Sequence, residues 1–194
     1  NVARLATHEG GSFLNWLLFE LKCGGVDCSV HSRVINTKNN GLPQSRSRFY
    51  IVGILVSTQQ HEFCFPEDVC SIDLQELLDP SSTADTWRRL PPHSQRSARA
   101  NVQAALRNKG TLKLLTSGSA LVLDADASAS WCSKARNLCL CLTRSRSSGL
   151  WLLSHGRHQS LAETSRLQGL LFASVTWSGP DSAGRQLLGN SMSM

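Results

Sequence analysis

The sequence predicts an α/β fold, and three segments near its beginning carry that prediction. Residues 12–23 are expected to form a helix, because leucines recur at helical spacing, Ser12 can act as the N-cap, and two glycines follow. Residues 26–36 contain regularly placed valines and an isoleucine, which favours a strand, and a polar turn comes next. Residues 49–56 are a continuous apolar run whose length and β-branched content predict a strand buried on both faces. This order indicates one side of an α/β sheet.

The middle of the chain has a different composition. Residues 57–140 are richer in serine, proline and charge than the first segment, and only short elements are expected there. These are a helix of one or two turns, an amphipathic helix and a short strand, at residues 73–78, 97–107 and 121–123. Residues 160–170 return to a clear helix, because Ser160 and Glu163 have the spacing of a capping box. The change in composition indicates an inserted region or a second subdomain.

Charge is distributed unevenly over the 194 residues. The formal net charge is +6, but residues 1–85 hold 6 basic and 10 acidic side chains, whereas residues 86–194 hold 14 basic and 4 acidic ones. No acidic residue lies between Asp85 and Asp124. The basic half is typical of a surface that binds a polyanion, with nucleic acid as the leading candidate, although a solvated arginine-rich surface has the same composition. The hydrophobic content of 41% excludes a disordered polar tail.

Targeting and metal signals are absent from the sequence. No apolar run approaches the roughly 18 residues of a membrane span, and no secretory signal pattern opens the chain. The seven cysteines are therefore expected to be reduced thiols in an intracellular protein. Cys139 and Cys141 would share one face of a strand and pack as small apolar side chains. No C-x-x-C pair occurs, and the spacing of His155 and His158 matches no structural zinc site, so no metal is expected.

The most distinctive local feature is residues 41–48, Gly-Leu-Pro-Gln-Ser-Arg-Ser-Arg, directly before the apolar run. Gln44, Arg46 and Arg48 alternate, so in extended backbone they project the same way. Two guanidinium groups that converge on one point favour a bound anion or a polarised carbonyl oxygen. A loop at the edge of an α/β sheet is also where ligands usually bind. A basic turn that only leads into a strand would show the same residues.

Four segments together resemble the second half of a cytosine-C5 DNA methyltransferase. Residues 1–2, Asn-Val, resemble the end of the family's Glu-Asn-Val motif, and residues 41–48 resemble its Gly-x-Pro-Gln-x-Arg-x-Arg segment. Residues 161–169, Leu-Ala-Glu-Thr-Ser-Arg-Leu-Gln-Gly, resemble a late helix of the family, and residues 185–192 resemble its closing Gly-Asn-Ser motif. The four segments come in the family's order. The resemblance covers both ends of the chain and little of its middle.

The resemblance implies a fold and an activity. The expected fold is part of a Rossmann-like S-adenosylmethionine-dependent methyltransferase sheet with an inserted target recognition subdomain. Residues 1–56 would be the end of the catalytic α/β domain, residues 57–148 the target recognition domain, and residues 149–194 the return to the catalytic domain. Such enzymes transfer a methyl group from S-adenosyl-L-methionine to C5 of a cytosine flipped out of double-stranded DNA. The location would be nuclear if the source is eukaryotic.

The resemblance also implies roles for individual residues. Arg48 would bind near O2 of the cytosine, with Arg46 beside it and Gln44 supporting the loop or the DNA. The residues implied at the cofactor are Asn1, Val2, Gly189, Asn190 and Ser191. The residues implied at DNA are Thr143, Arg144 and Arg146. Glu163 and Arg166 are expected to be structural.

Two family features are missing from these residues. No cysteine follows a proline, although the family's nucleophile lies in a Pro-Cys motif, and the glycine-rich loop for the cofactor is absent. Both precede the Glu-Asn-Val motif in the family's order. The chain is therefore expected to be a fragment that lacks the nucleophile and is inactive alone. Two alternatives stay open, a non-catalytic DNA-binding remnant of such an enzyme and a related RNA cytosine-5 methyltransferase.

Overall fold

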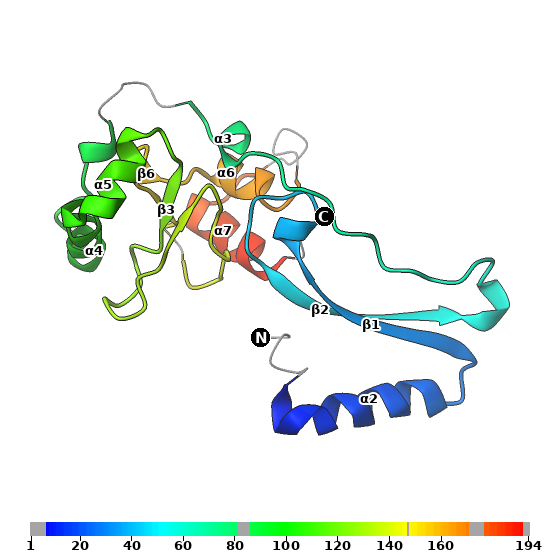
Figure 1. The fold of residues 1–194 in the computed structure, drawn as a ribbon. Helices are drawn as coiled ribbons and strands as arrows, with labels where there is room; N and C mark the ends of the chain where they lie inside the picture. Colours follow the sequence, from blue (N-terminus) through cyan, green and yellow to red (C-terminus); the bar gives the residue numbers. More distant parts are fainter. Residues whose placement is uncertain (1–6, 81–85, 147, 171–176, 192–194) are drawn as a thin grey trace.

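The computed structural model describes residues 7–80, 86–146, 148–170 and 177–191. In Figure 1 a long two-stranded ribbon, β1 and β2, extends to one side with the helix α2 alongside it. The remaining helices and strands gather in a lobe at the other end of the ribbon, where α6 and α7 also lie. None of the helices in the described part of the chain has the length and apolar character needed to span a bilayer.

The ribbon and its helix confirm the first three predicted elements. Helix α2 spans Ser12–Cys23, β1 spans Cys28–Asn36 and β2 spans Ser47–Leu55. The strands pair antiparallel, with His31 opposite Val52. The predicted cap of α2 is wrong by one residue, because Ser12 is already helical and the N-cap position is Gly11, in the left-handed conformation at φ 89°. The Ser12 hydroxyl instead donates to the carbonyl of Glu9 in the preceding 3₁₀ turn η1, His8–Gly11.

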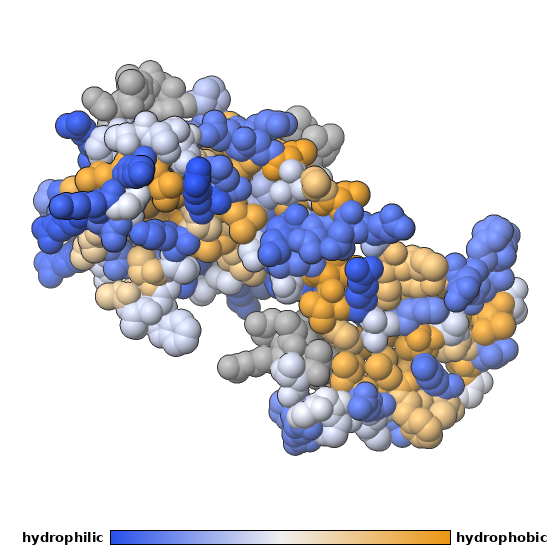
Figure 2. Space-filling model, viewed as in Figure 1, coloured by the Kyte–Doolittle hydropathy of each residue, from blue (hydrophilic) through white to orange (hydrophobic). Residues whose placement is uncertain are grey.

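Strand β2 is not buried on both faces, so this prediction is wrong. Phe49 is 9% exposed, whereas Ile51 and Leu55 are 37% and 48% exposed. The reason is that β1 is the strand paired with β2 within the described residues, so its sheet has two strands. Apolar side chains also gather on the visible surface over α2 and the ribbon (Figure 2). On α2, Trp16 and Phe19 are 55% and 62% exposed.

A second, four-stranded antiparallel sheet forms the centre of the lobe, in the order β4-β3-β5-β6. Strand β3, Leu121–Leu123, was predicted. The other three strands were not, because each has only two or three residues and no apolar alternation long enough to read. They are β4, Lys134–Arg136, β5, Trp151–Leu152, and β6, Arg157–His158. Because β3 pairs with β5, one sheet joins the regions expected on the two sides of residue 148.

Strand β3 is buried on both of its faces, and alternation assigns its side chains to two clusters. Val122 packs in one cluster with Leu74 of α3, Leu74–Leu77. Leu121 and Leu123 pack in the other, with Val102 of α4. Helices α4, Arg96–Arg107, and α5, Lys109–Thr116, cover this second face. The sheet therefore lies between two apolar layers, and α5 is a helix that the sequence did not predict.

Two helices complete the lobe. Helix α6 spans Leu161–Arg166, shorter than the predicted 160–170, and its capping box is confirmed. The Ser160 hydroxyl accepts from the Glu163 backbone N–H at 3.1 Å, and the Glu163 carboxylate accepts from the Ser160 N–H at 2.7 Å. Helix α7 spans Asp181–Asn190. Three further 3₁₀ turns are η2, Thr37–Asn39, η3, Val56–Thr58, and η4, Thr86–Arg88.

Candidate functional site

The loop between β1 and β2 folds back on the end of β1. Thr37 in η2 donates its hydroxyl to the Gln44 carbonyl at 2.5 Å, and its backbone N–H donates to the Arg46 carbonyl at 3.2 Å. The Asn36 side-chain oxygen accepts from the Arg46 N–H at 2.9 Å. Gly41 has φ +88°, a left-handed conformation that glycine adopts without a steric penalty. These bonds close the loop and fix the direction of the side chains that follow.

Gln44 lies at the inner side of this loop and is fully buried. Its segment runs beside Cys139, because the Ser45 N–H donates to the Cys139 carbonyl at 2.9 Å and the Cys139 N–H donates to the Pro43 carbonyl at 2.7 Å. Within the described residues, neither atom of the Gln44 side-chain amide has a hydrogen-bond partner. A buried amide is costly to leave unpaired, so this position calls for a water molecule or a ligand atom.

Arg46 is 1% exposed, and its guanidinium binds backbone carbonyls from two distant segments. One terminal nitrogen donates to the Leu142 carbonyl at 2.6 Å. The other donates to the Gly189 carbonyl at 3.1 Å and to the Ser191 carbonyl. Burial, and then the neighbouring Arg48 cation, lowers the pKa of Arg46. Arg46 therefore joins the β1–β2 loop to residue 142 and to the end of α7.

Arg48 lies two residues further along β2 and is partly exposed. One of its terminal nitrogens donates to the Ser47 carbonyl at 2.9 Å, a local bond that leaves its other donors available. Neither Arg46 nor Arg48 forms an ion pair with a carboxylate anywhere in the described segments. Two neighbouring cations without a counter-charge create a positive site that favours an anion or a polarised oxygen.

The residues expected at DNA lie on the loop after Leu142. Thr143 and Arg144 are exposed, and the Thr143 and Ser145 hydroxyls are 3.1 Å apart. Arg146 is instead bound to the carboxylate of Asp124 by two bonds of 2.6 and 2.9 Å, and the bond to Asp124 raises the pKa of Arg146. The loop is thus held at one end through the carbonyl of residue 142 and at the other through Asp124, a partner that sequence reasoning missed.

The end of α7 packs directly against this loop. Gly189 is buried, and a Cβ atom at its position would lie 2.6 Å from the backbone nitrogen of Arg144 and from the carbonyl carbon of Thr143. Only glycine fits such an approach. Asn190 is exposed, and the Ser191 hydroxyl donates to the Leu188 carbonyl at 2.8 Å. Asn1 and Val2, the other residues expected at the cofactor, lie outside the described residues.

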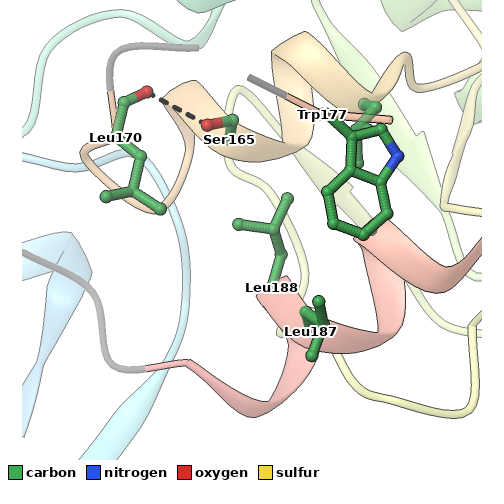
Figure 3. Close-up of a pocket in the computed structure, with 7 residues that line it drawn as sticks. Ser165, Leu170, Trp177, Leu187 and Leu188 are labelled. Carbon is green, nitrogen blue, oxygen red and sulfur yellow. Dashed lines mark hydrogen bonds between the residues drawn. The ribbon is translucent and has the colours of Figure 1, made fainter. Parts of the chain in front are cut away.

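A small apolar cavity of about 160 Å³ lies between α6 and α7 (Figure 3). Leu170, Leu187, Leu188 and Trp177 line it, and the Ser165 hydroxyl beside it donates to the Leu170 carbonyl at 3.2 Å. This lining offers no charged group. A ligand with a sulfonium and a carboxylate would find no counter-charge there, so the cavity does not suit S-adenosylmethionine.

Glu163 and Arg166 are held in ion pairs with residues that the sequence analysis did not single out. The fully buried Glu163 carboxylate accepts two 2.7 Å bonds from Arg157, and Arg166 contacts Asp79 at 2.5 Å. Glu163 also accepts from the Asp79 N–H at 2.8 Å. These pairs connect α6 to β6 and to the segment after α3. No group of three His, Cys, Asp or Glu side chains suited to a metal ion occurs in the described segments.

The family model described as "C-5 cytosine-specific DNA methylase" matches residues 1–124. The chain belongs to this family. The match includes the whole β1–β2 loop with Gln44, Arg46 and Arg48, and it ends one residue after β3. The predicted family is therefore confirmed.

Curated relatives of this chain are type II methyltransferases that match over a limited region. It is similar to M.NgoBI of Neisseria gonorrhoeae, with 42% identity over 80 residues, 41% of this chain and 24% of that protein. It is also similar to M.HaeII of Haemophilus aegyptius, with 38% identity over 69 residues, 36% of this chain and 20% of that protein. The match thus spans about a quarter or less of these relatives' length.

Two solved structures share the fold over almost the whole chain. The methyltransferase EhMeth of Entamoeba histolytica aligns with a TM-score of 0.53 and 15% identity, covering 96% of this chain and 55% of that one. The S. pombe Dnmt2 methyltransferase aligns with a TM-score of 0.52 and 14% identity, covering 94% and 59%. The predicted α/β, Rossmann-like methyltransferase fold is confirmed by this likeness. The chain spans a little over half the length of both structures.

Proposed function

We propose that this chain is the base-holding and DNA-recognition part of a DNA cytosine-5 methyltransferase. The observation that carries the proposal is the set of bonds made by Arg46. Through them the β1–β2 loop with Arg48, the exposed loop at residues 143–146 and the end of α7 at residues 189–191 are held together. A methyltransferase must bring its base site, its DNA contact and its cofactor contact close together, so these three segments would need to lie side by side.

Arg48 is proposed to contact the flipped cytosine at O2. Its uncommitted donors and the uncompensated charge of the neighbouring Arg46 suit an oxygen that gains negative charge during the reaction. Arg46 itself is proposed as a positioning residue, because its buried guanidinium is bound to carbonyls. The unpaired Gln44 amide beside this loop is proposed to bind a nucleotide atom or an ordered water.

Residues 57–148 are proposed as the target recognition domain, with residues 1–56 and 149–194 belonging to the catalytic domain. Thr143 and Arg144 are proposed to contact DNA directly because both are exposed. Arg146 would do so after exchanging its Asp124 partner for a phosphate. Double-stranded DNA is the proposed partner, in keeping with the basic half of the sequence.

S-adenosyl-L-methionine would supply the methyl group when bound. The described residues that fit it are few, since the exposed Asn190 amide can form hydrogen bonds whereas the Gly189 and Ser191 carbonyls are bound by Arg46. The 194 residues also lack a Pro-Cys nucleophile. Burial raises the pKa of the Cys139 thiol to about 12, which keeps this thiol protonated at neutral pH. The chain alone is therefore proposed to bind DNA without methylating it.

Two measurements on the 194-residue chain test this proposal. Fluorescence anisotropy with a cytosine-containing duplex at several salt concentrations should show binding that weakens with salt. The Arg144→Ala variant should reduce the salt slope by about 1, as expected for one lost phosphate contact. Arg33→Ala, which removes an equal charge from the ribbon, is the matched control and should leave the slope unchanged. Failure of the wild-type chain to bind duplex DNA would refute the proposal.

Methyl transfer from labelled S-adenosylmethionine to DNA is the second measurement, and none is expected. Robust incorporation by these 194 residues would show that the fragment interpretation is wrong. In a longer protein that also carries the nucleophile, Arg48→Ala should lower turnover much more than DNA affinity. Equal losses of turnover and DNA affinity would indicate that Arg48 only contacts a phosphate. A longer protein without turnover would support the non-catalytic alternative.

A further inference from the structure

Trp131 is the most exposed of the large apolar side chains in the described part of the chain, at 79%. It lies on the ten-residue loop between β3 and β4, residues 124–133, which we call the hairpin loop. In Figure 1 the chain after β3 projects from the body of the lobe. A single exposed apolar side chain is common on protein surfaces, but an indole offers a large flat face that a partner can cover.

The hairpin loop is firmly held, so the exposure of Trp131 does not come from a loose segment. The Asn101 side chain of α4 donates to the Ala125 and Ala127 carbonyls, both at 2.8 Å. The Asp124 N–H donates to the Ser133 carbonyl at 2.9 Å, which closes the loop. The backbone N–H of Trp131 donates to the Ser128 carbonyl at 2.8 Å.

Side chains on both sides of Trp131 strengthen this presentation. Cys132 packs against the cluster formed by α4, α5 and β3, so the chain is anchored immediately after the indole. Ser128 and Ser130 precede it and are exposed and small. Trp131 is therefore the large side chain that projects into solvent here. It loses little side-chain entropy when it binds a partner, because it has only two rotatable bonds.

Basic residues lie on the segments joined to the hairpin loop. Lys134 and Arg136 of β4 follow the hairpin loop and are exposed, and they donate to the Thr111 and Ser119 hydroxyls at 2.7 and 3.1 Å. Of the two acidic residues of the hairpin loop, Asp124 is bound by Arg146, and Asp126 lines a surface hollow together with Arg96. The Asp124–Arg146 pair also ties the hairpin loop to residues 143–146, the proposed DNA contact.

We propose that Trp131 is a nucleobase-stacking residue, whose indole packs against a base that has lost a stacking neighbour. The inference rests on the proposed function and adds a residue that contacts a DNA base whose stacking neighbour has been flipped out. An enzyme that extrudes one nucleotide leaves its neighbours unstacked. A rigid exposed indole on a loop that the Asp124–Arg146 pair ties to the proposed DNA contact has the chemistry to cover such a base, because aromatic stacking adds affinity where cations bind phosphate.

The test compares Trp131→Ala with Trp131→Phe in the full 194-residue chain. Anisotropy is measured with an intact duplex and with the same duplex containing one abasic site opposite a cytosine. Because stacking on one base contributes about 5- to 150-fold in affinity, Trp131→Ala should weaken binding to the abasic duplex within that range. Trp131→Phe, which keeps an aromatic face, should retain most of the affinity. Trp16→Ala on α2, another exposed tryptophan, is the matched control and should bind like wild type.

A second readout follows stacking directly. Titration of the wild-type chain with the abasic duplex should quench part of its tryptophan fluorescence, and this part should be missing in Trp131→Phe. Circular dichroism of each variant should match wild type, because a side chain that is 79% exposed contributes little to the core.

The outcomes separate this inference from the proposed function. Wild-type affinity in Trp131→Ala would overturn the stacking role and leave DNA binding intact. Equal losses in Trp131→Ala and Trp131→Phe would overturn it as well, since shape and not the aromatic face would then matter. Absence of binding by the wild-type chain would overturn both, and would favour a protein surface as the partner of Trp131.

Discussion

Replacement of Arg46 by methionine should destabilise the chain strongly, although the substituted residue lies on a loop. Methionine keeps the length and most of the volume of the arginine stem but removes all of its donors. The buried carbonyls of Leu142 and Gly189 would lose their bonds from the guanidinium, as would the partly buried carbonyl of Ser191. The segments at residue 142 and residues 189–191 would then be left without their shared partner.

The magnitude follows from the burial of the acceptors. A buried acceptor left unpaired costs about 1–3 kcal/mol, and two of the three Arg46 bonds lie in buried surroundings. Part of this cost is offset, because burying a guanidinium is itself unfavourable. We expect the free energy of unfolding to fall by about 2–4 kcal/mol. Arg46→Lys should fall between wild type and Arg46→Met, because one ammonium cannot reach the same set of carbonyls.

Urea unfolding followed by circular dichroism measures this change, with Arg136→Met as the control. Arg136 is exposed and donates to a single side chain, Ser119, so its loss should stay within about 0.5 kcal/mol. Hydrogen exchange should show faster opening of residues 142–146 and 189–191 in Arg46→Met alone. A loss no larger than that of the control would refute the view that Arg46 anchors these segments.

Three further predictions concern single positions that are buried or partly buried. Gly189→Ala should lower the free energy of unfolding by about 1–3 kcal/mol in urea titrations, because the new Cβ would meet the backbone nitrogen of Arg144, and full stability would contradict this packing. Cys139 should resist alkylation at pH 8 while the exposed Cys64 reacts, as peptide mass spectrometry would reveal, since burial raises the Cys139 pKa to about 12. Burial, followed by the nearby Arg157 cation, lowers the pKa of His155 below its unfolded value of 6.5. The contribution of neutral His155 to the free energy of unfolding should therefore be fully present above pH 6.5 and be lost as pH falls through the folded pKa. Urea unfolding at several pH values measures this, and the same decline in a His155→Gln variant would show that His155 is not its cause.

The elements that the sequence predicted well are those with a strong local signal. Helix α2 and strands β1 and β2 have long periodic or apolar runs, and the capping box of α6 is a short-range interaction. The short strands β4, β5 and β6 could not be found in this way, because two or three residues show no period. The prediction that β2 is buried on both faces was also wrong, because an apolar run does not show how many strands lie beside it.

The candidate site shows the same division. The order of residues 41–48 was enough to select Gln44, Arg46 and Arg48, and the family match then included them. The sequence could not show that Arg46 turns inward while Arg48 stays accessible, because both alternate in the same way along the strand. That difference depends on carbonyls that are 96 and 143 residues away in the chain.

The sequence alone therefore determined the family, the α/β class and the loop that carries the arginines, because short motifs and apolar periods are local properties. The tertiary structure decided what those residues touch. It placed Gly189 against the backbone of residues 143–144, paired Arg146 with Asp124 and left the indole of Trp131 in solvent. Such contacts join segments far apart in the chain, and only folding brings together the groups whose burial and charge decide their roles.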